Sequence, residues 1–191
     1  MERSSEVLDF WFGAPGSPGY GEPREAWFKK EPAFDTEIAA RFRGLWNDVR
    51  AGKHADWTDD PRRCLALTLV CDQFPRNMFR GNPDSYATDQ RALALAHHQV
   101  RREFNKSMSC VELLFAYLPF QHSENIADQR LSVALYEAMP EHPKKENWLD
   151  FAVRHMKIVE RFGRFPHRNA VLGRASTAEE IEFLKQPGSS F

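Results

Sequence analysis

The chain has few cysteines, almost no net charge and no long apolar run. Its 191 residues include three cysteines, and 26 Lys plus Arg against 27 Asp plus Glu leave a formal net charge of -1. No stretch approaches the ~18 consecutive apolar residues of a membrane-spanning helix. This balance argues against a general basic surface for nucleic acid or acidic membranes. We therefore expect no membrane contact and keep nucleic-acid binding only as a minor alternative.

Cysteine use and the N-terminal residues both favour a cytoplasmic protein. On one helix, Cys64 and Cys71 would lie about 10.5 Å apart along the axis, beyond the ~7 Å between Cα atoms that a disulfide allows. With Cys110 the number is odd, and Cys-x-x-Cys spacing is absent, so we expect reduced, buried thiols. The apolar run within residues 1–13 is short and interrupted by Asp9, so we expect no signal peptide.

Motifs for metals and nucleotides are missing as well. The sequence has no His-Glu-x-x-His, Cys-x-x-Cys or EF-hand pattern. The glycines of residues 13–21 do not follow a predicted strand, so they are not typical of a phosphate-binding loop. We therefore expect neither a metal nor a cofactor.

Helical periodicity is what the sequence has in abundance. Apolar residues recur at three- and four-residue steps, which is the spacing of one face of an α-helix. Two helix starts carry a capping box, Ser109 with Glu112 and Thr177 with Glu180, and Gly163 is placed to end a helix. The expected helices are 33–50, 62–74, 88–104, 109–118, 124–139, 147–162 and 178–185.

These patterns predict an all-α protein with about eight helices in antiparallel pairs, because the loops between them are short. The composition does not shift along the chain, so we expect one compact domain over residues 1–191. Residues 13–23 form a Gly/Pro-rich loop within it, and residues 186–191 are expected to fray. Residues 64–74 are apolar nearly all round, which favours a central buried helix over a short buried strand.

Two strings of the sequence echo one another. DQFPRNMFRG at residues 72–81 and RFGRFPHRNAVLGR at residues 161–174 both contain Phe-Pro followed closely by Arg-Asn. Proline lacks an N–H and fixes φ, so Pro75 and Pro166 are expected to break or start helices. The Arg and Asn that follow would then lie just outside a helix end.

The second string is dense in cations. Residues 161–174 hold four Arg and one His and no Asp or Glu, and Phe and Leu residues are interleaved with them. A solvated charged surface does not fit that apolar context, and a partly buried Arg without a partner costs several kcal/mol. Two interpretations stay open: carboxylates from elsewhere in the chain pair with these Arg residues in a structural network, or an anionic ligand does.

Two carboxylates are candidate partners. Asp72 lies at the C-terminal end of an apolar helix, where the helix dipole disfavours an anion, so we expect it to pair with Arg76. Asp89 opens a helix, which is a favourable place for a carboxylate, and we expect it to cap that helix.

A third string, YLPFQHSENIADQR at residues 117–130, contains the candidates for proton transfer. Pro119 is expected to end one helix. Two interpretations of the residues that follow stay open. In one, His122 is an acid/base group and Glu124 is its orienting partner. In the other, Ser123 caps the next helix and Glu124 lies in its first turn. His155, on an apolar helix face, is expected to be a hydrogen-bonded core residue.

The strings DQFPRN, PFQHSE and GRFPHRN, with VLDFWFG before them, occur in order over about residues 6–191. Together they resemble the domain-of-unknown-function family numbered 924. The resemblance implies an all-α, tetratricopeptide-like arrangement, expected here as an irregular right-handed array, and it implies no particular reaction. The recurrent polar positions of that family fall here on Asp72, Gln73, Arg76, Asn77, Arg80, Asp89, His122, Ser123, Glu124, Asp128, Gln129, Arg164, His167, Arg168, Asn169 and Arg174.

These residues suggest a pocket for a small anionic molecule, because Arg binds carboxylate or phosphate through paired hydrogen bonds. We expect the three strings to meet around one cavity. If the protein is an enzyme, acid/base chemistry of the hydrolase or lyase type fits His122, Glu124 and Asp72. The alternatives are a tetratricopeptide-like module that binds acidic peptides and a purely structural polar network.

Overall fold

The computed structural model describes residues 2–190, and these residues form helices joined by turns, with no strand among them. None of the helices described combines the length and the apolar composition needed to cross a bilayer. The all-α prediction is therefore confirmed. The α-helices are α1 (Arg3–Phe12), α2 (Pro32–Arg50), α3 (Pro61–Met78), α4 (Asp89–Arg101), α5 (Cys110–His122), α6 (Ile126–Glu137), α7 (Lys145–Phe162) and α8 (Ala178–Phe183). Short 3₁₀ turns include η3 (Pro83–Tyr86) and η5 (Pro166–Arg168).

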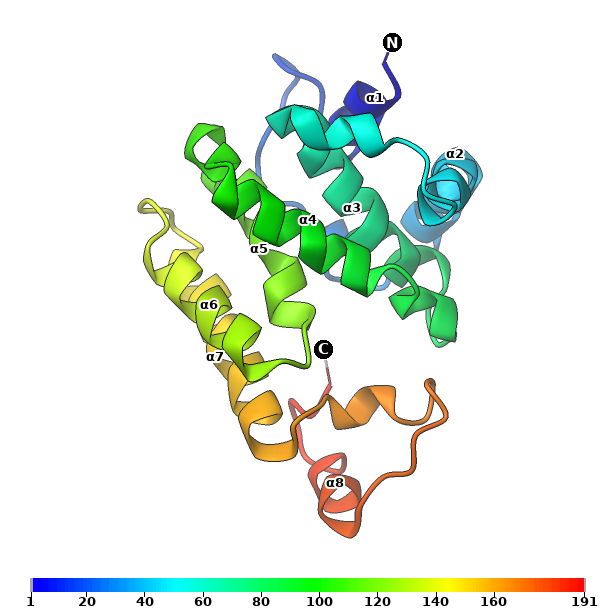
Figure 1. Ribbon diagram of the computed structural model, residues 1–191, viewed down its shortest axis with the longest axis vertical. Coiled ribbons are helices and arrows are strands. Elements are labelled where there is room, and N and C mark those ends of the chain that lie inside the picture. Colours follow the sequence, from blue (N-terminus) through cyan, green and yellow to red (C-terminus); the bar gives the residue numbers. More distant parts are fainter. Residues whose placement is uncertain (1, 191) are drawn as a thin grey trace.

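Helix α3 lies at the centre of one compact domain (Figure 1). It packs against α1, α2, α4 and α5, and each helix from α2 to α6 contacts the next one along the chain. Its central position fits its apolar composition, and residues 64–75 are all buried. The tetratricopeptide-like arrangement of these helices stays a prediction.

The three cysteines are free, as expected. Cys64 and Cys71 are fully buried in α3, and burial raises the pKa of each thiol to about 12, so both stay protonated. Cys110 differs from the prediction because it is only half-buried. It lies at the first position of α5, where the helix meets solvent.

Aromatic rings attach α1 to the central helix. The ring of Trp11 lies 5.7 Å from that of Phe74 on α3 and 5.4 Å from that of Phe115 on α5, measured between centroids. Trp27 stacks on Trp11 at 5.8 Å and meets the face of Phe115 at 4.8 Å. Such pairs add to the apolar area that they bury. Both tryptophans are core residues, Trp11 fully buried and Trp27 4% exposed.

The predicted helix breaks at two prolines are wrong. Pro75 lies inside α3, which continues to Met78, and Pro119 lies inside α5, which continues to His122. A proline deprives the carbonyl four residues earlier of its helical donor. In α3 that carbonyl belongs to Cys71, and the hydroxyl of Thr88 donates to it at 2.6 Å. A neighbouring element thus replaces the missing hydrogen bond.

The third proline and the predicted helix ends behave as expected. Pro166 begins η5, and the preceding Phe165 is extended with φ -93° and ψ 106°. The capping boxes of Ser109 and Thr177 are both present. Gly163 ends α7 in the left-handed region with φ 69°, a conformation that favours glycine.

Two predicted caps are wrong. Asn125, not Ser123, caps α6, and its side chain accepts a hydrogen bond from the backbone of Ala127. Asp89 is the first residue of α4 but makes no capping hydrogen bond, because its carboxylate binds Arg76 instead. Asp89 is thus taken by a contact from another helix, whereas the hydroxyl of Ser123 donates to Asp128, five residues along the chain.

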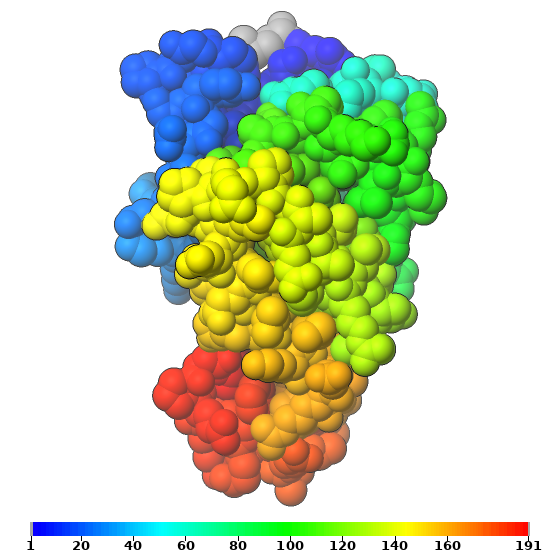
Figure 2. Space-filling model, turned by 90° about the vertical axis from the view of Figure 1, so that its left-hand side faces the viewer, coloured from blue at the N-terminus to red at the C-terminus, as the bar shows by residue number. Residues whose placement is uncertain are grey.

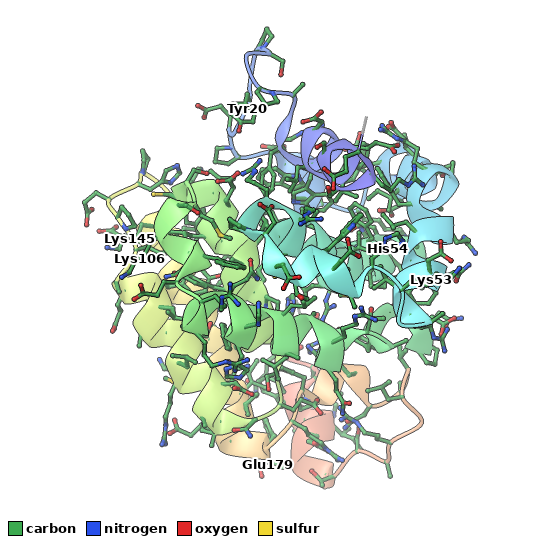
Figure 3. The ribbon with its side chains drawn as sticks, turned by 45° about the horizontal axis from the view of Figure 1, so that its top comes forward. Tyr20, Lys53, His54, Lys106, Lys145 and Glu179 are labelled. Atoms are coloured by element: carbon green, nitrogen blue, oxygen red, sulfur yellow. The ribbon has the colours of Figure 1, made fainter. Side chains whose placement is uncertain are left out.

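The segment after α7 forms one end of the molecule, coloured orange to red in Figure 2. It has a small core of its own, in which Phe165 packs with Ile158 and Val159. The described part of the tail packs on this end rather than projecting from it, since Ser189 is buried and donates to the carbonyl of Leu184 at 3.2 Å. The Gly/Pro-rich loop projects at the opposite end, with Tyr20 near its tip (Figure 3).

We expect Phe115→Ala to lower the free energy of unfolding by about 3–5 kcal/mol, because the fully buried ring contacts three buried aromatic neighbours, Trp11, Phe12 and Trp27. Phe28→Ala is the matched control: Phe28 stacks on the same ring but is 61% exposed, so its loss should cost less than about 1 kcal/mol. Urea denaturation of both variants measures the difference. Equal losses would contradict this account of the core.

Candidate functional site

The three strings meet where the ends of α3 and α5 approach the segment after α7. Nδ1 of His122 lies 2.8 Å from a carboxylate oxygen of Asp72. The backbone N–H of Phe165 donates to Glu124 at 2.8 Å. Side chains from all three strings therefore lie together, and the helix ends position them.

Asp72 is the most deeply buried carboxylate of this region, 1% exposed. It accepts hydrogen bonds from His122 and, at 2.5 Å, from the amide of Gln73, and Arg76 lies 3.4 Å away. Burial opposes ionisation of Asp72, but the interactions with His122 and Arg76 outweigh burial and lower its pKa to about 2. Asp72 is thus an ionised carboxylate, and its predicted pairing with Arg76 is confirmed.

Arg76 links α3 to the start of α4. Its two terminal nitrogens donate to the two carboxylate oxygens of Asp89 at 2.8 and 3.0 Å, and one of them also donates to the backbone carbonyl of Asp72 at 2.6 Å. Burial disfavours the cation, but Asp89 and Asp72 together raise the pKa of Arg76. This fork occupies both oxygens of Asp89.

Arg168 is the least satisfied cation of the region. Its guanidinium carbon lies 4.5 Å from the ring centroid of Phe165 and 4.9 Å from that of Tyr86, and its side chain is 8% exposed. Nη1 approaches Asp89 only to 3.6 Å, beyond hydrogen-bond distance. Nε has no partner, and the side chain makes no hydrogen bond with the described residues. Burial and the neighbouring Arg76 lower the pKa of Arg168.

His122 offers a proton acceptor. Because Asp72 is ionised, Nδ1 of His122 donates to it, and the neutral ring carries its lone pair on Nε2. Nε2 makes no hydrogen bond with the described residues, and the side chain is 14% exposed. Burial and the charge of Arg76 lower the pKa of His122, which favours the neutral ring at neutral pH.

Glu124 anchors the C-terminal segment. One oxygen accepts from Nη1 of Arg174 at 2.6 Å, and the other accepts from Nη2 at 2.9 Å and from the N–H of Phe165. Burial opposes ionisation, but Arg174 and this N–H lower the pKa of Glu124. Both oxygens are engaged, so the geometry supports an anchoring role for Glu124 rather than proton transfer.

Glu180 anchors the same segment from the other side. Arg164 donates to both of its oxygens at 2.7 and 2.8 Å, and Asn169 donates at 3.3 Å. Asn169 in turn accepts from Arg174 at 3.0 Å. Carboxylates of the chain therefore pair with Arg164 and Arg174, which is the structural interpretation of the cation-dense string. The capping box identified Glu180 in the sequence, but nothing there indicated its bond to Arg164.

Asn77 and Arg80 face away from this region and bind α2. Both bind Asp35: Arg80 at 2.7 and 2.9 Å, and the amide of Asn77 at 2.8 Å. Burial opposes ionisation of Asp35, but these two partners lower its pKa. Asp35 is not among the site residues expected from the sequence, because it lies in the first turn of α2, more than 40 residues before its partners.

Ser123, Asp128 and Gln129 form a separate group between α4 and α6. Asp128 accepts from the hydroxyl of Ser123 at 2.8 Å and lies 2.9 Å from Nε2 of His97. Gln129 donates to backbone carbonyls at the end of α5, among them that of Ser123 at 2.6 Å. His97 is a partner that the sequence analysis missed, since its pair lies 31 residues away.

The remaining candidates and neighbours surround His122. His155 is 5% exposed and its Nδ1 lies 2.8 Å from the backbone carbonyl of Phe151, which confirms the predicted core histidine. Burial, with the charge of Arg168, lowers the pKa of His167 to about 4.

We call the polar group at the centre the Arg168 cluster, which consists of Asp72, Arg76, Tyr86, Asp89, His122 and Arg168.

Two hollows of the described surface lie elsewhere. One of about 290 Å³ lies beside the start of α3, where Asp60 and Arg62 line it, and one of about 510 Å³ lies along α2 near His54 (labelled in Figure 3). Neither includes a residue of the Arg168 cluster, so the predicted cavity stays a prediction. Within residues 2–190, no group of three or more His, Cys, Asp and Glu side chains is arranged to hold a metal ion.

Residues 7–188 match the model of a family described as bacterial proteins of unknown function (DUF924), and the chain belongs to that family. Its structure is similar to that of a protein of unknown function from Agrobacterium tumefaciens, with 37% identity and a TM-score of 0.84 over 95% of this chain and 96% of that one. A comparison with curated proteins finds no match. The family resemblance drawn from the sequence is thereby confirmed.

We expect Asp72→Asn to destabilise the protein in a pH-dependent way. The folded pKa of Asp72, about 2, lies below its ordinary value, so the carboxylate adds stability above about pH 4 and loses this contribution as the pH falls through about 2. The cost of the substitution should be on the order of 2 kcal/mol at neutral pH and shrink toward pH 2.

Urea denaturation across this pH range measures the cost. Asp56→Asn, at a carboxylate that is 69% exposed, is the control and should change the free energy of unfolding by less than about 0.5 kcal/mol. A cost of Asp72→Asn that does not vary with pH would contradict the ionised, paired state.

Proposed function

We propose that the Arg168 cluster binds a small anionic molecule. The observation that carries this proposal is the state of Arg168, a cation that is 8% exposed and makes no side-chain hydrogen bond with the described residues. Buried charges in proteins are ordinarily paired and hydrogen-bonded, because an unpaired one costs several kcal/mol. A bound anion supplies the missing partner.

The charges around Arg168 support an anion rather than another ligand. Asp89 is the carboxylate nearest to it, but Arg76 already engages both of its oxygens. Asp72 is engaged by His122 and Gln73. Arg76 thus takes both oxygens of Asp89 and also pairs with Asp72, so neither carboxylate forms a hydrogen bond with Arg168.

The aromatic contacts orient the free donors. Tyr86 and Phe165 lie near the guanidinium of Arg168 at 4.9 and 4.5 Å, which holds the group by its π contacts. The N–H groups of a guanidinium lie in its plane, where they form the fork that binds carboxylate or phosphate. Aromatic contacts do not use up these donors, so they are available to a ligand.

Accessibility favours a small ligand over a peptide. The side chains of His122, Arg76 and Asp89 are only 14%, 19% and 21% exposed, so little of the cluster reaches the surface. An acidic peptide would need an open trough to reach the same donors. The structural alternative needs no ligand: it makes Arg168 part of a polar network of the kind that holds Arg164 and Arg174.

The proposal predicts that inorganic phosphate binds the wild-type protein and that Arg168→Gln weakens this binding at least tenfold, since a charge-assisted hydrogen bond contributes about 1.5–3 kcal/mol. Isothermal titration calorimetry measures the affinity. Arg161→Gln is the matched control from the same string: Arg161 is 49% exposed and pairs with Glu179 on the surface, so phosphate binding should not change.

The structural alternative has a different outcome. In that case no variant binds phosphate, and Arg168→Gln only lowers the melting temperature. A wild-type protein that binds phosphate no better than Arg168→Gln would refute the proposed site.

A further inference from the structure

We infer that the anion held by Arg168 carries a hydroxyl group beside its negative charge, as a 2-hydroxycarboxylate does, and that Nε2 of His122 accepts the proton of this hydroxyl. This inference rests on the proposed function and adds the class of the ligand and the role of His122. It makes His122 a catalytic residue in the sense that it contacts the reacting O–H.

Contacts on two sides connect His122 with Arg168. On one side His122 binds Asp72 at 2.8 Å, Arg76 lies 3.4 Å from Asp72 and binds Asp89 at 2.8 Å, and Arg168 lies 3.6 Å from Asp89. These polar residues form one side of a ring of contacts.

The other side of the ring is formed by aromatic side chains. The ring of His155 lies 6.5 Å from that of His122 and 5.6 Å from that of Phe165, between centroids. The guanidinium of Arg168 lies 4.5 Å from the same Phe165 ring. His122 and Arg168 therefore lie on opposite sides of one ring of side chains, and the inferred ligand binds between them.

The two residues have opposite hydrogen-bonding character. Arg168 presents only donors. His122 presents a lone pair at Nε2, because Asp72 holds the ring proton on Nδ1. An anion without a hydroxyl would direct its own lone pairs at Nε2, which is repulsive. An anion with a neighbouring hydroxyl satisfies both residues at once.

This arrangement also permits proton transfer. The O–H bond of the ligand breaks and an N–H bond forms at Nε2, while the electron pair and the negative charge stay on the oxygen. The imidazolium that forms lies 2.8 Å from the carboxylate of Asp72, which stabilises it. Reversal returns the proton, so the step needs no co-reactant.

Two ligands that differ in one hydroxyl test the inference: DL-lactate and propionate. We expect the wild-type protein to bind lactate about tenfold more tightly near neutral pH, because one satisfied hydrogen bond contributes up to about 1.4 kcal/mol. His122→Phe removes the acceptor and should bind the two equally. Arg168→Gln should bind neither. His142→Phe is the matched control: His142 stacks on Trp148 at 4.6 Å, outside the cluster, so the preference should persist.

A second measurement keeps the test decisive if His122→Phe does not fold. Nitrogen-15 NMR of the wild-type histidines should show His122 with its proton on Nδ1, and the Nε2 signal should shift with lactate but not with propionate. Equal binding of both ligands, abolished in Arg168→Gln, would overturn the role of His122 and leave the anion site in place. Binding of neither ligand would overturn both.

Discussion

The buried charge of Asp72 is the constraint on which the polar centre of this protein depends. An ionised carboxylate that is 1% exposed, near the C-terminal end of a central helix, needs donors from several directions. Gln73 and Arg76 come from the same helix, and His122 comes from the end of α5. Because Arg76 must also bind Asp89, this one charge determines how the ends of α3, α4 and α5 are arranged.

The C-terminal segment is attached to that centre by two further carboxylates. Glu124 holds Arg174 and the backbone of Phe165, and Glu180 holds Arg164. With the surface pair of Arg161 and Glu179, these ion pairs give a structural role to three of the four Arg residues in the string at residues 161–174. They also place Arg168 between two aromatic rings, where the described chain offers it no hydrogen bond. The contrast between Arg168 and its neighbours is what separates a candidate binding residue from a structural one.

Much of the fold followed from local patterns, and the errors have physical reasons. Apolar periodicity identified the helices, and the two capping boxes marked helix starts at Ser109 and Thr177. The break expected at Pro75 is absent because Thr88, from another element, supplies the hydrogen bond that proline removes. In the candidate site, the pairing of Asp72 with Arg76 could be predicted because the two are four residues apart, whereas the bond to His122 spans 50 residues.

The sequence by itself determined the all-α class, the buried central helix and the set of polar residues that face the interior, because periodicity and capping are local properties of the chain. Apart from the pair of Asp72 and Arg76, tertiary structure decided which of those residues pair. Local patterns assigned Asp89 to a helix end and left Glu124 either to proton transfer or to a first helical turn, but packing gave the first to Arg76 and the second to Arg174. Charge pairing depends on distance in space, so only the folded chain could show that Arg168 lacks a hydrogen-bonded partner.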